Sequence, residues 1–210
     1  MDHNIINTLA LTLGAGWASG LNLYATILTL GLANTLGYAS LPSGLEVLSN
    51  PLVLGAAGLM YSVEFFADKI PGVDTAWDGL HTFIRIPAGV LLAAGAASGF
   101  HLGEAAALGA ALLGGGLAAG SHMTKAGSRV LINTSPEPFS NWAASFTEDA
   151  TVVGGLWTAL NYPWVFLALL LLAVLLMAWL LPRLWRAIRG LFRSIGRFFG
   201  YARETGPPTR

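Results

Sequence analysis

The sequence predicts an all-α protein, a polytopic membrane helix bundle with about six spans, within a range of roughly five to seven. The chain is 54% hydrophobic and 10% charged, whereas soluble domains average about 25% charged residues. Apolar stretches near the roughly 20 residues that a crossing needs recur along its 210 residues. We therefore expect a transmembrane domain over residues 1–181, an amphipathic surface helix over 182–203 and a disordered tail over 204–210.

The first apolar segment, residues 6–32, is interrupted by the polar sequence SGLN at Ser19 to Asn22. A broken or re-entrant helix is one interpretation, because discontinuous helices place a polar break inside transporter bundles. Close helix packing is the other, because Gly16 and Gly20 form a small-x-x-x-small pattern. Both leave this segment inserted in the membrane.

The other expected spans are 51–67, 87–101, 103–121, 143–160 and 164–181. Residues 33–50 are rich in Asn, Gly, Ser and Pro and are expected to form a loop. Pro51 is expected to open the second span, and Pro87 is expected to start a new element. Six crossings then leave both termini on the cytoplasmic side, as the positive-inside rule favours.

A first polar block, residues 63–89, contains four of the eleven carboxylates between segments that carry almost no charge. On a helix over residues 73–86, Asp74, Asp78, His81 and Arg85 fall on one face. Glu64 and Asp68 lie one helical turn apart just before it. Two interpretations fit: an interfacial amphipathic helix with hydrated charges, or a polar site that lines a cavity at membrane depth.

A second polar block covers residues 122–149. His122, Lys125 and Arg129 share one helical face, and residues 133–141 are expected to form a Pro-broken loop in which Ser140 or Asn141 caps the next helix. Glu148 and Asp149 then enter an apolar segment. A cytoplasmic loop followed by an ordinary charged helix start would also explain this block.

The C-terminal segment combines arginines on one side with large apolar side chains on the other. This pattern is typical of a helix lying on an anionic membrane surface, and a nucleic-acid patch is disfavoured because the apolar face needs lipid. The predicted lipid-binding residues are Arg183, Arg186, Arg189, Arg193 and Arg197.

The sequence has no cysteine, so it has no disulfide or thiolate chemistry. It also lacks the P-loop, HExxH and GxSxG motifs, and we expect no cofactor. The enzymatic alternative is a metal-dependent site for a phosphorylated lipid, with Asp74 and Asp78 holding Mg²⁺ and Arg85 or Arg129 meeting phosphate.

Three sequence pieces resemble a bacterial integral-membrane family catalogued as a domain of unknown function. They are SGLNLYAT at residues 19–26, FFADKIPGVDTAWDGLHTFIRIPAG at residues 65–89, and SHMTKAGSR with SNWAASFTED at residues 121–149. The resemblance covers roughly residues 8 to 160. It implies a multi-span fold and supplies no reaction.

The leading functional hypothesis is a small transporter or channel for an anionic or proton-coupled solute, more plausible here than an enzyme. The two polar blocks are expected to meet and form one site, because charges at bilayer depth need partners. We expect Asp68, Asp74 or Asp78 to pair with Lys125 or Arg129, and Arg85 to pair with Glu148 or Asp149. The predicted pathway consists of Asn22, Glu64, Asp68, Lys69, Asp74, Asp78, His81, Arg85, His122, Lys125, Arg129, Asn141, Glu148 and Asp149.

A non-catalytic membrane scaffold is the remaining alternative, in which the charges only set topology. The expected location is the bacterial inner membrane, with a cytoplasmic C terminus. Membrane lipids are the expected partners, together with an unidentified small solute or ion. A homo-oligomer is compatible with the sequence.

Overall fold

The computed structural model describes residues 3–98, 103–134 and 139–204. Within these residues the chain forms seven α-helices, one short 3₁₀ helix and no strand, which confirms the predicted all-α bundle. The helices are α1 (His3–Leu21), α2 (Leu23–Thr35), η1 (Ser43–Ser49), α3 (Pro51–Ala67), α4 (Val73–Ala97), α5 (Glu104–Ile132), α6 (Phe139–Asn161) and α7 (Pro163–Glu204).

Three of the described helices are long and apolar enough to cross a membrane: Val73–Ala97, Glu104–Ile132 and Pro163–Ser194. Shorter apolar helices cover Ile5–Leu21, Leu23–Thr35 and Pro51–Ala67. The lengths and composition of these helices indicate a membrane protein, as predicted.

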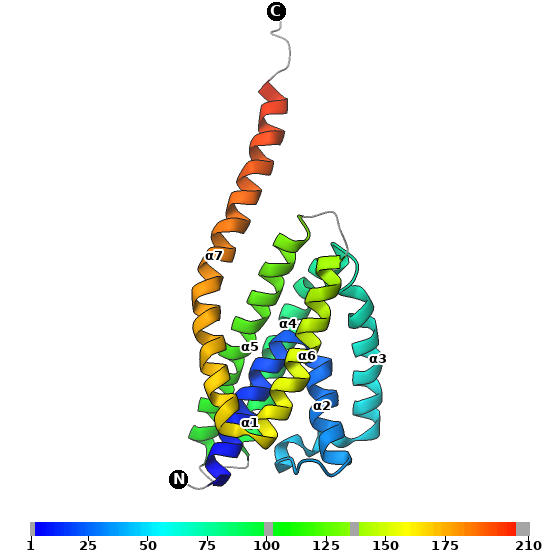
Figure 1. The fold of residues 1–210 in the computed structure, drawn as a ribbon, viewed down its shortest axis with the longest axis vertical. Helices are drawn as coiled ribbons and strands as arrows, with labels where there is room; N and C mark the ends of the chain where they lie inside the picture. Colours follow the sequence, from blue (N-terminus) through cyan, green and yellow to red (C-terminus); the bar gives the residue numbers. More distant parts are fainter. Residues whose placement is uncertain (1–2, 99–102, 135–138, 205–210) are drawn as a thin grey trace, which may run out of the picture.

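The predicted break in the first segment is confirmed, and it lies at Asn22 between α1 and α2. Asn22 has extended backbone angles, and its side-chain oxygen accepts a hydrogen bond from Ala25 N at 2.9 Å, which caps α2. Figure 1 shows α1 rising from the end that carries the N terminus and α2 returning toward that same end. Together they form a helical hairpin.

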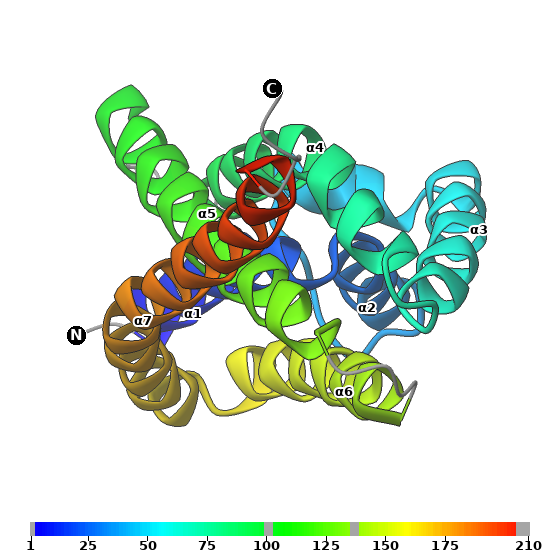
Figure 2. The same cartoon turned by 90° about the horizontal axis from the view of Figure 1, so that it is seen from above.

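The hairpin bears on the expected topology. Because α1 and α2 enter and leave at one end, the start of α1 and the C-terminal end of α7 lie at opposite ends of the bundle (Figure 1). The side of the membrane on which each terminus lies stays a prediction. Figure 2 shows α1 and α2 surrounded by the other helices, and almost every residue from Ala10 to Gly20 is buried.

The sequence also placed two boundaries incorrectly. Helix α4 continues through Pro87 to Ala97, so the expected charged helix and the expected third span are one element. Helix α5 likewise joins the predicted fourth span to the cationic face that ends at Arg129. A proline inside a helix removes one hydrogen bond, but surrounding helices hold α4 in place on both sides of it.

Close contacts between small residues hold the C-terminal half of α1 against α5 and hold α4 against α5. A Cβ atom on Gly16 would lie 2.6 Å from Gly114 Cα, and one on Gly89 would lie 2.5 Å from Ala118 Cβ. Such contacts let helix backbones approach one another without bulky side chains. The predicted small-residue packing thus coexists with the broken helix.

Two loops differ from expectation. The stretch predicted as a loop over residues 33–50 includes the end of α2 and the 3₁₀ helix η1, whose Gly44 N donates to Ser98 Oγ at 3.0 Å. Helix α6 begins at Phe139, so Ser140 and Asn141 lie inside its first turn and do not cap it from outside.

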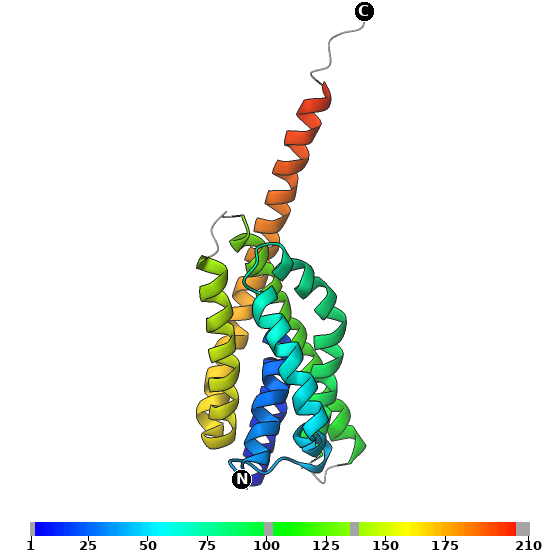
Figure 3. The same cartoon turned by 90° about the vertical axis from the view of Figure 1, so that its right-hand side faces the viewer.

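Helix α7 runs without interruption from Pro163 through Pro182 to Glu204 and projects beyond the bundle (Figure 3). Part of its apolar face packs on protein, because Leu184 is buried and a Cβ atom on Gly127 would lie 3.2 Å from its Cδ1. The expected separate helix over 182–203 therefore continues α7, and its position on a membrane surface stays a prediction. Of the expected tail, residues 205–210 lie outside the described residues.

Candidate functional site

The two polar blocks meet inside the bundle. Four helices contribute to a charged cluster that we define as Glu64, Asp68, Asp78, Arg85, Lys125, Arg129 and Glu148. Ion pairs with N···O distances of 2.6–3.8 Å join all seven side chains. The predicted meeting of the blocks is confirmed by these distances.

Lys125 is at the centre of the charged cluster. Its Nζ lies 2.8 Å from Asp68 Oδ2, 3.2 Å from Glu148 Oε2, 3.4 Å from Glu64 Oε1 and 3.8 Å from Asp78 Oδ1. The Lys125 side chain is fully buried. One ammonium group therefore contacts carboxylates from α3, its C-terminal cap, α4 and α6.

The two arginines flank this lysine. Arg85 donates to Glu64 Oε1 at 2.6 Å and to Asp78 Oδ1 at 3.1 Å. Arg129 donates to Glu148 through Nε at 3.3 Å and through Nη2 at 2.8 Å, a bidentate pair. The prediction that Arg85 would pair with Glu148 or Asp149 is wrong, whereas the predicted pairing of Asp68 with Lys125 is confirmed.

The composition of the charged cluster is unbalanced. It has four carboxylates and three cations, so its formal charge is −1 when every group is ionised. Among the described residues, Glu64 Oε2, Asp68 Oδ1 and Asp78 Oδ2 are buried and accept no hydrogen bond. Buried polar atoms without partners are uncommon and mark places where a proton, water or ion can bind.

His122 fixes the position of Arg85. Its Nδ1 lies 3.3 Å from Arg85 Nη1, and its Nε2 lies 2.8 Å from Thr82 Oγ1. A guanidinium group only donates hydrogen bonds, so Arg85 is the donor in its contact with Nδ1. Thr82 in turn donates to Asp78 O at 3.1 Å, which links α5 to the backbone of α4.

The broken helix contacts the charged cluster at Arg85 and also binds Asp149, which lies outside the cluster. Asn22 Nδ2 donates to Asp149 Oδ1 at 3.0 Å, and Tyr61 OH donates to Asp149 Oδ2 at 2.9 Å. Gly20 O also accepts from Arg85 Nη1 at 3.5 Å. The N-terminus of α2, with its partial positive charge, therefore lies beside an acidic side chain in the bundle interior.

Asp74 belongs to a neighbouring network and holds no ion pair within 4.0 Å in the described part of the chain. Its Oδ1 accepts from Thr75 N at 2.6 Å and from Asn133 Nδ2 at 2.7 Å. Asn141 donates to Asn133 Oδ1 at 2.7 Å and accepts from Arg129 Nη1 through its backbone oxygen at 3.0 Å. This network joins the ends of α4, α5 and α6.

Two predicted residues lie at the edge of the site. His81 contacts Tyr24 OH at 3.1 Å and stacks on Trp77 with ring centroids 4.4 Å apart. Lys69, in the turn after α3, places its Nζ 3.0 Å from the centre of the Phe65 ring. Burial lowers the pKa of Lys69 below its ordinary value of 10.5, although Asp149 and Asp68 partly offset this effect.

The predicted lipid-binding arginines lie far along α7. Arg183, Arg186, Arg189 and Arg193 are exposed, and Arg183 and Arg189 lie over the rings of Trp179 and Trp185. The side chain of Arg197 lies outside the described residues. These groups form a surface separate from the charged cluster.

Sequence reasoning missed Tyr61, Thr82 and Asn133 as members of the site. Tyr61 precedes Glu64 by three residues and Thr82 follows Asp78 by four, so helical spacing placed each beside a predicted residue. Their uncharged side chains gave no electrostatic reason to select them.

Residues 9–183 match the model of a family described as Domain of unknown function (DUF4126). The chain belongs to this family. No curated protein and no solved structure matches it. The match to DUF4126 contains the whole charged cluster and ends at Arg183, at the start of the arginine-rich part of α7.

Proposed function

We propose that this membrane protein carries protons, alone or together with a solute, through the charged cluster. The observation that supports this proposal best is the buried Lys125 ammonium group in contact with four carboxylates. A proton can move among several carboxylates that surround one fixed cation, because each site differs little in its charged neighbours. The excess of one carboxylate gives the cluster a formal place for one proton.

Stability alone is a weak reason to keep such a cluster. Replacing a buried ion pair by well-packed apolar residues is often neutral or stabilising by about 1–4 kcal/mol. Ionisable groups inside membrane bundles generally line ion or substrate pathways. The arrangement of seven charged side chains within ion-pair distance therefore favours transport over a scaffold.

The hairpin supports the same proposal. Discontinuous helices that end at mid-membrane are a recurring feature of transporter binding sites. Here the break at Asn22 lies against Asp149, which follows the cluster residue Glu148. A proton that leaves the charged cluster can thus reach the carboxylate of Asp149. Asn22 and Tyr61 hold this carboxylate beside the N-terminus of α2.

Protons fit the site better than an anionic solute. All three cations of the charged cluster already contact carboxylates, so an anion would have to displace them. The enzymatic alternative has less support, because Asp74 and Asp78 bind different partners. No group of three or more His, Asp or Glu side chains in the described ranges is placed to hold a metal ion.

Proton flux into liposomes tests this proposal. Reconstituted protein should acidify vesicles under an imposed membrane potential, and Asp78→Asn and Glu148→Gln should each abolish that flux. Glu46→Gln and Glu104→Gln are matched controls, because both glutamates are exposed outside the cluster. Unchanged flux in both cluster variants would support the scaffold alternative, and metal-dependent turnover of a lipid phosphate would support the enzyme.

The arginine-rich end is proposed to be cytoplasmic, in the inner membrane of a bacterium. The arginine-rich part of α7 and the turn between α3 and α4, which contains Lys69, lie toward the same end of the bundle (Figure 1), and the positive-inside rule favours this end as cytoplasmic. Because the chain has no cysteine, single cysteines at Ser43 and Ser194 can be labelled separately. They should react from opposite sides of the membrane, and same-side labelling would contradict this orientation.

A further inference from the structure

We propose that Arg183 and Arg186, on the outward side of α7, bind the phosphate group of an anionic phospholipid. The site lies where α7 leaves the bilayer, and it does not depend on the proposed proton flux. Among the described residues, every ion pair belongs to the charged cluster, so no carboxylate there neutralises these two arginines. A guanidinium group is planar and can donate to two phosphate oxygens at once.

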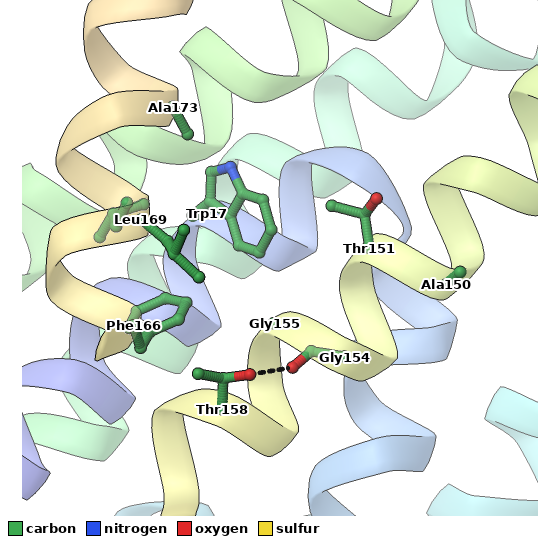
Figure 4. A pocket seen from close by; sticks show the side chains of 10 residues that line it. Trp17, Ala150, Thr151, Gly154, Gly155, Thr158, Phe166, Leu169 and Ala173 are labelled. Atoms are coloured by element: carbon green, nitrogen blue, oxygen red, sulfur yellow. Dashed lines mark hydrogen bonds between the residues drawn. The ribbon is translucent and has the colours of Figure 1, made fainter. Parts of the chain in front are cut away.

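Helix α7 has one side against the bundle and one side exposed. Phe166 is buried, and its ring centre lies 6.1 Å from that of Trp17 in an edge-to-face contact (Figure 4). Leu184 lies about five helical turns further along, on the same side of the helix, and is also buried. The opposite side has the composition of a surface against lipid, and its exposed residues include Leu172, Leu175, Leu176 and Trp179.

Arg183 and Arg186 continue this exposed side. They follow Trp179 by one and by two helical turns, so the three side chains form one row. Both guanidinium groups point back toward the apolar part of α7: Arg183 Nη1 donates to Trp179 O at 2.6 Å, and Arg186 Nε donates to Pro182 O at 3.2 Å. Arg183 Cζ also lies 3.6 Å from the centre of the Trp179 ring. Each cation is therefore held about one turn before its own Cα atom.

Trp179 marks the depth of these two cations. Its side chain is 54% exposed, and exposed tryptophan rings at the end of an apolar span lie at the headgroup level. The headgroup layer is roughly 5–7 Å thick on each side of the bilayer. The two backbone oxygens that the guanidinium groups contact are about 4.5 Å apart along the helix axis, at about 1.5 Å per residue. Both cations therefore lie within the layer that contains the lipid phosphates.

Packing against α5 fixes this part of α7 in an upright position. A Cβ atom on Gly127 would lie 3.2 Å from Leu184 Cδ1 and 3.8 Å from Ile188 Cδ1. Helix α7 therefore cannot bend onto the membrane surface before Ile188 without losing these contacts, and Figure 3 shows it continuing away from the bundle. Arg193 is about 21 Å beyond Trp179 along the axis, more than twice the Debye length of roughly 8–10 Å. The upright helix thus assigns phosphate binding to its first two arginines.

Two matched double variants test this assignment. Arg183→Gln with Arg186→Gln removes the proposed phosphate contacts, whereas Arg189→Gln with Arg193→Gln removes the same charge from exposed positions further along α7. Each full-length protein is equilibrated in liposomes of equal phosphatidylglycerol and phosphatidylcholine and extracted in mild detergent. Native mass spectrometry then counts the retained lipids, and the unmodified protein should retain phosphatidylglycerol in preference to phosphatidylcholine.

The ratio of retained phosphatidylglycerol to phosphatidylcholine should fall at least about tenfold when Arg183 and Arg186 are replaced, because each basic residue near an anionic surface contributes about fivefold. It should fall less than about threefold when Arg189 and Arg193 are replaced, because salt screens charges at that distance. Arg186→Gln and Arg193→Gln alone are a second matched pair if the first double variant unfolds. Equal falls in the members of either pair, or an unchanged ratio without Arg183 and Arg186, would overturn the proposal.

Discussion

Helices α4 and α5 pack side by side, but the residues between them change from small at one end to charged at the other. Toward the N-terminal end of the bundle, Gly89 and Gly114 approach Ala118 and Ala93 so closely that added Cβ atoms would collide. Toward the other end, Arg85 of α4 contacts His122 of α5, and Lys125 of α5 contacts Asp78 of α4. One helix pair therefore contains two different kinds of interior.

The difference shows where the bundle is built for tight packing and where it is built to hold charge. Backbone contacts between small residues leave no room for a polar path. The charged region instead contains several cations and carboxylates within ion-pair distance of one another. The break at Asn22 lies at the boundary between these two regions, where α1 ends.

The largest expected effect comes from removing one charge from the charged region. Arg85→Met leaves the carboxylates of Glu64 and Asp78 without their main partner. We expect the free energy of unfolding in mild detergent to fall by about 3–5 kcal/mol, the usual cost of breaking a buried ion pair. Arg193→Met, at an exposed position on α7, should change stability by less than about 0.5 kcal/mol. Equal stability of the two variants would show that the cluster is hydrated.

A smaller effect is expected in the tightly packed region. Gly16→Val should destabilise the protein by about 1–3 kcal/mol, because the new side chain meets the backbone of Gly114. Gly58→Val is the control, since a Cβ atom there meets nothing within 4 Å. Thermal unfolding of both variants in the same detergent measures the difference. A Gly16 variant as stable as the control would mean that α1 and α5 can move apart freely.

The boundary itself is tested at Asn22. Asn22→Ala removes the cap of α2 and one donor to Asp149, and should cost about 1–2 kcal/mol. Asn22→Ser retains a capping oxygen but not the amide donor, so it should recover part of this loss. Chemical unfolding of the two variants provides the comparison. If serine is no better than alanine, capping does not contribute to the break.

The smallest expected effect is the pH dependence caused by Lys69. Because its pKa is lowered in the folded protein, the unfolded chain binds this proton more strongly, and stability should rise with pH up to the ordinary value of 10.5. Below the lowered pKa this contribution is constant and unfavourable. Lys69→Met should therefore be slightly more stable at pH 7 and lack this alkaline rise. A rise of the same size in both proteins would assign it to another group.

Local periodicity predicted much of this molecule. The helical spacing of Asp78 and Arg85, and of Lys125 and Arg129, placed each pair on one face, and the four side chains do meet. The polar break at Asn22 was also visible, because Ser, Gly and Asn interrupt an apolar segment. These features depend on residues only a few positions apart.

Features set by contacts between distant segments could not be predicted in the same way. Pro87 normally ends a helix, yet α4 continues because neighbouring helices support both of its halves. The partner of Arg85 depended on the rotation of α3 relative to α6, which decides whether Glu64 or Glu148 faces it. Sequence spacing within one helix contains no information about that rotation. The DUF4126 family model covers residues 9–183 and assigns them no reaction.

The central claim is that the charged cluster serves transport and is not required for folding. Replacing Glu64 and Asp78 by Leu together with Arg85→Met removes two acids and one base, which leaves Asp68 and Glu148 paired with Lys125 and Arg129. The most direct measurement compares proton flux into liposomes and thermal unfolding for this triple variant and the unmodified protein. We predict a variant that is at least as stable, because apolar residues often replace buried ion pairs without loss, and that carries no proton flux. A folded triple variant with undiminished proton flux would contradict the claim.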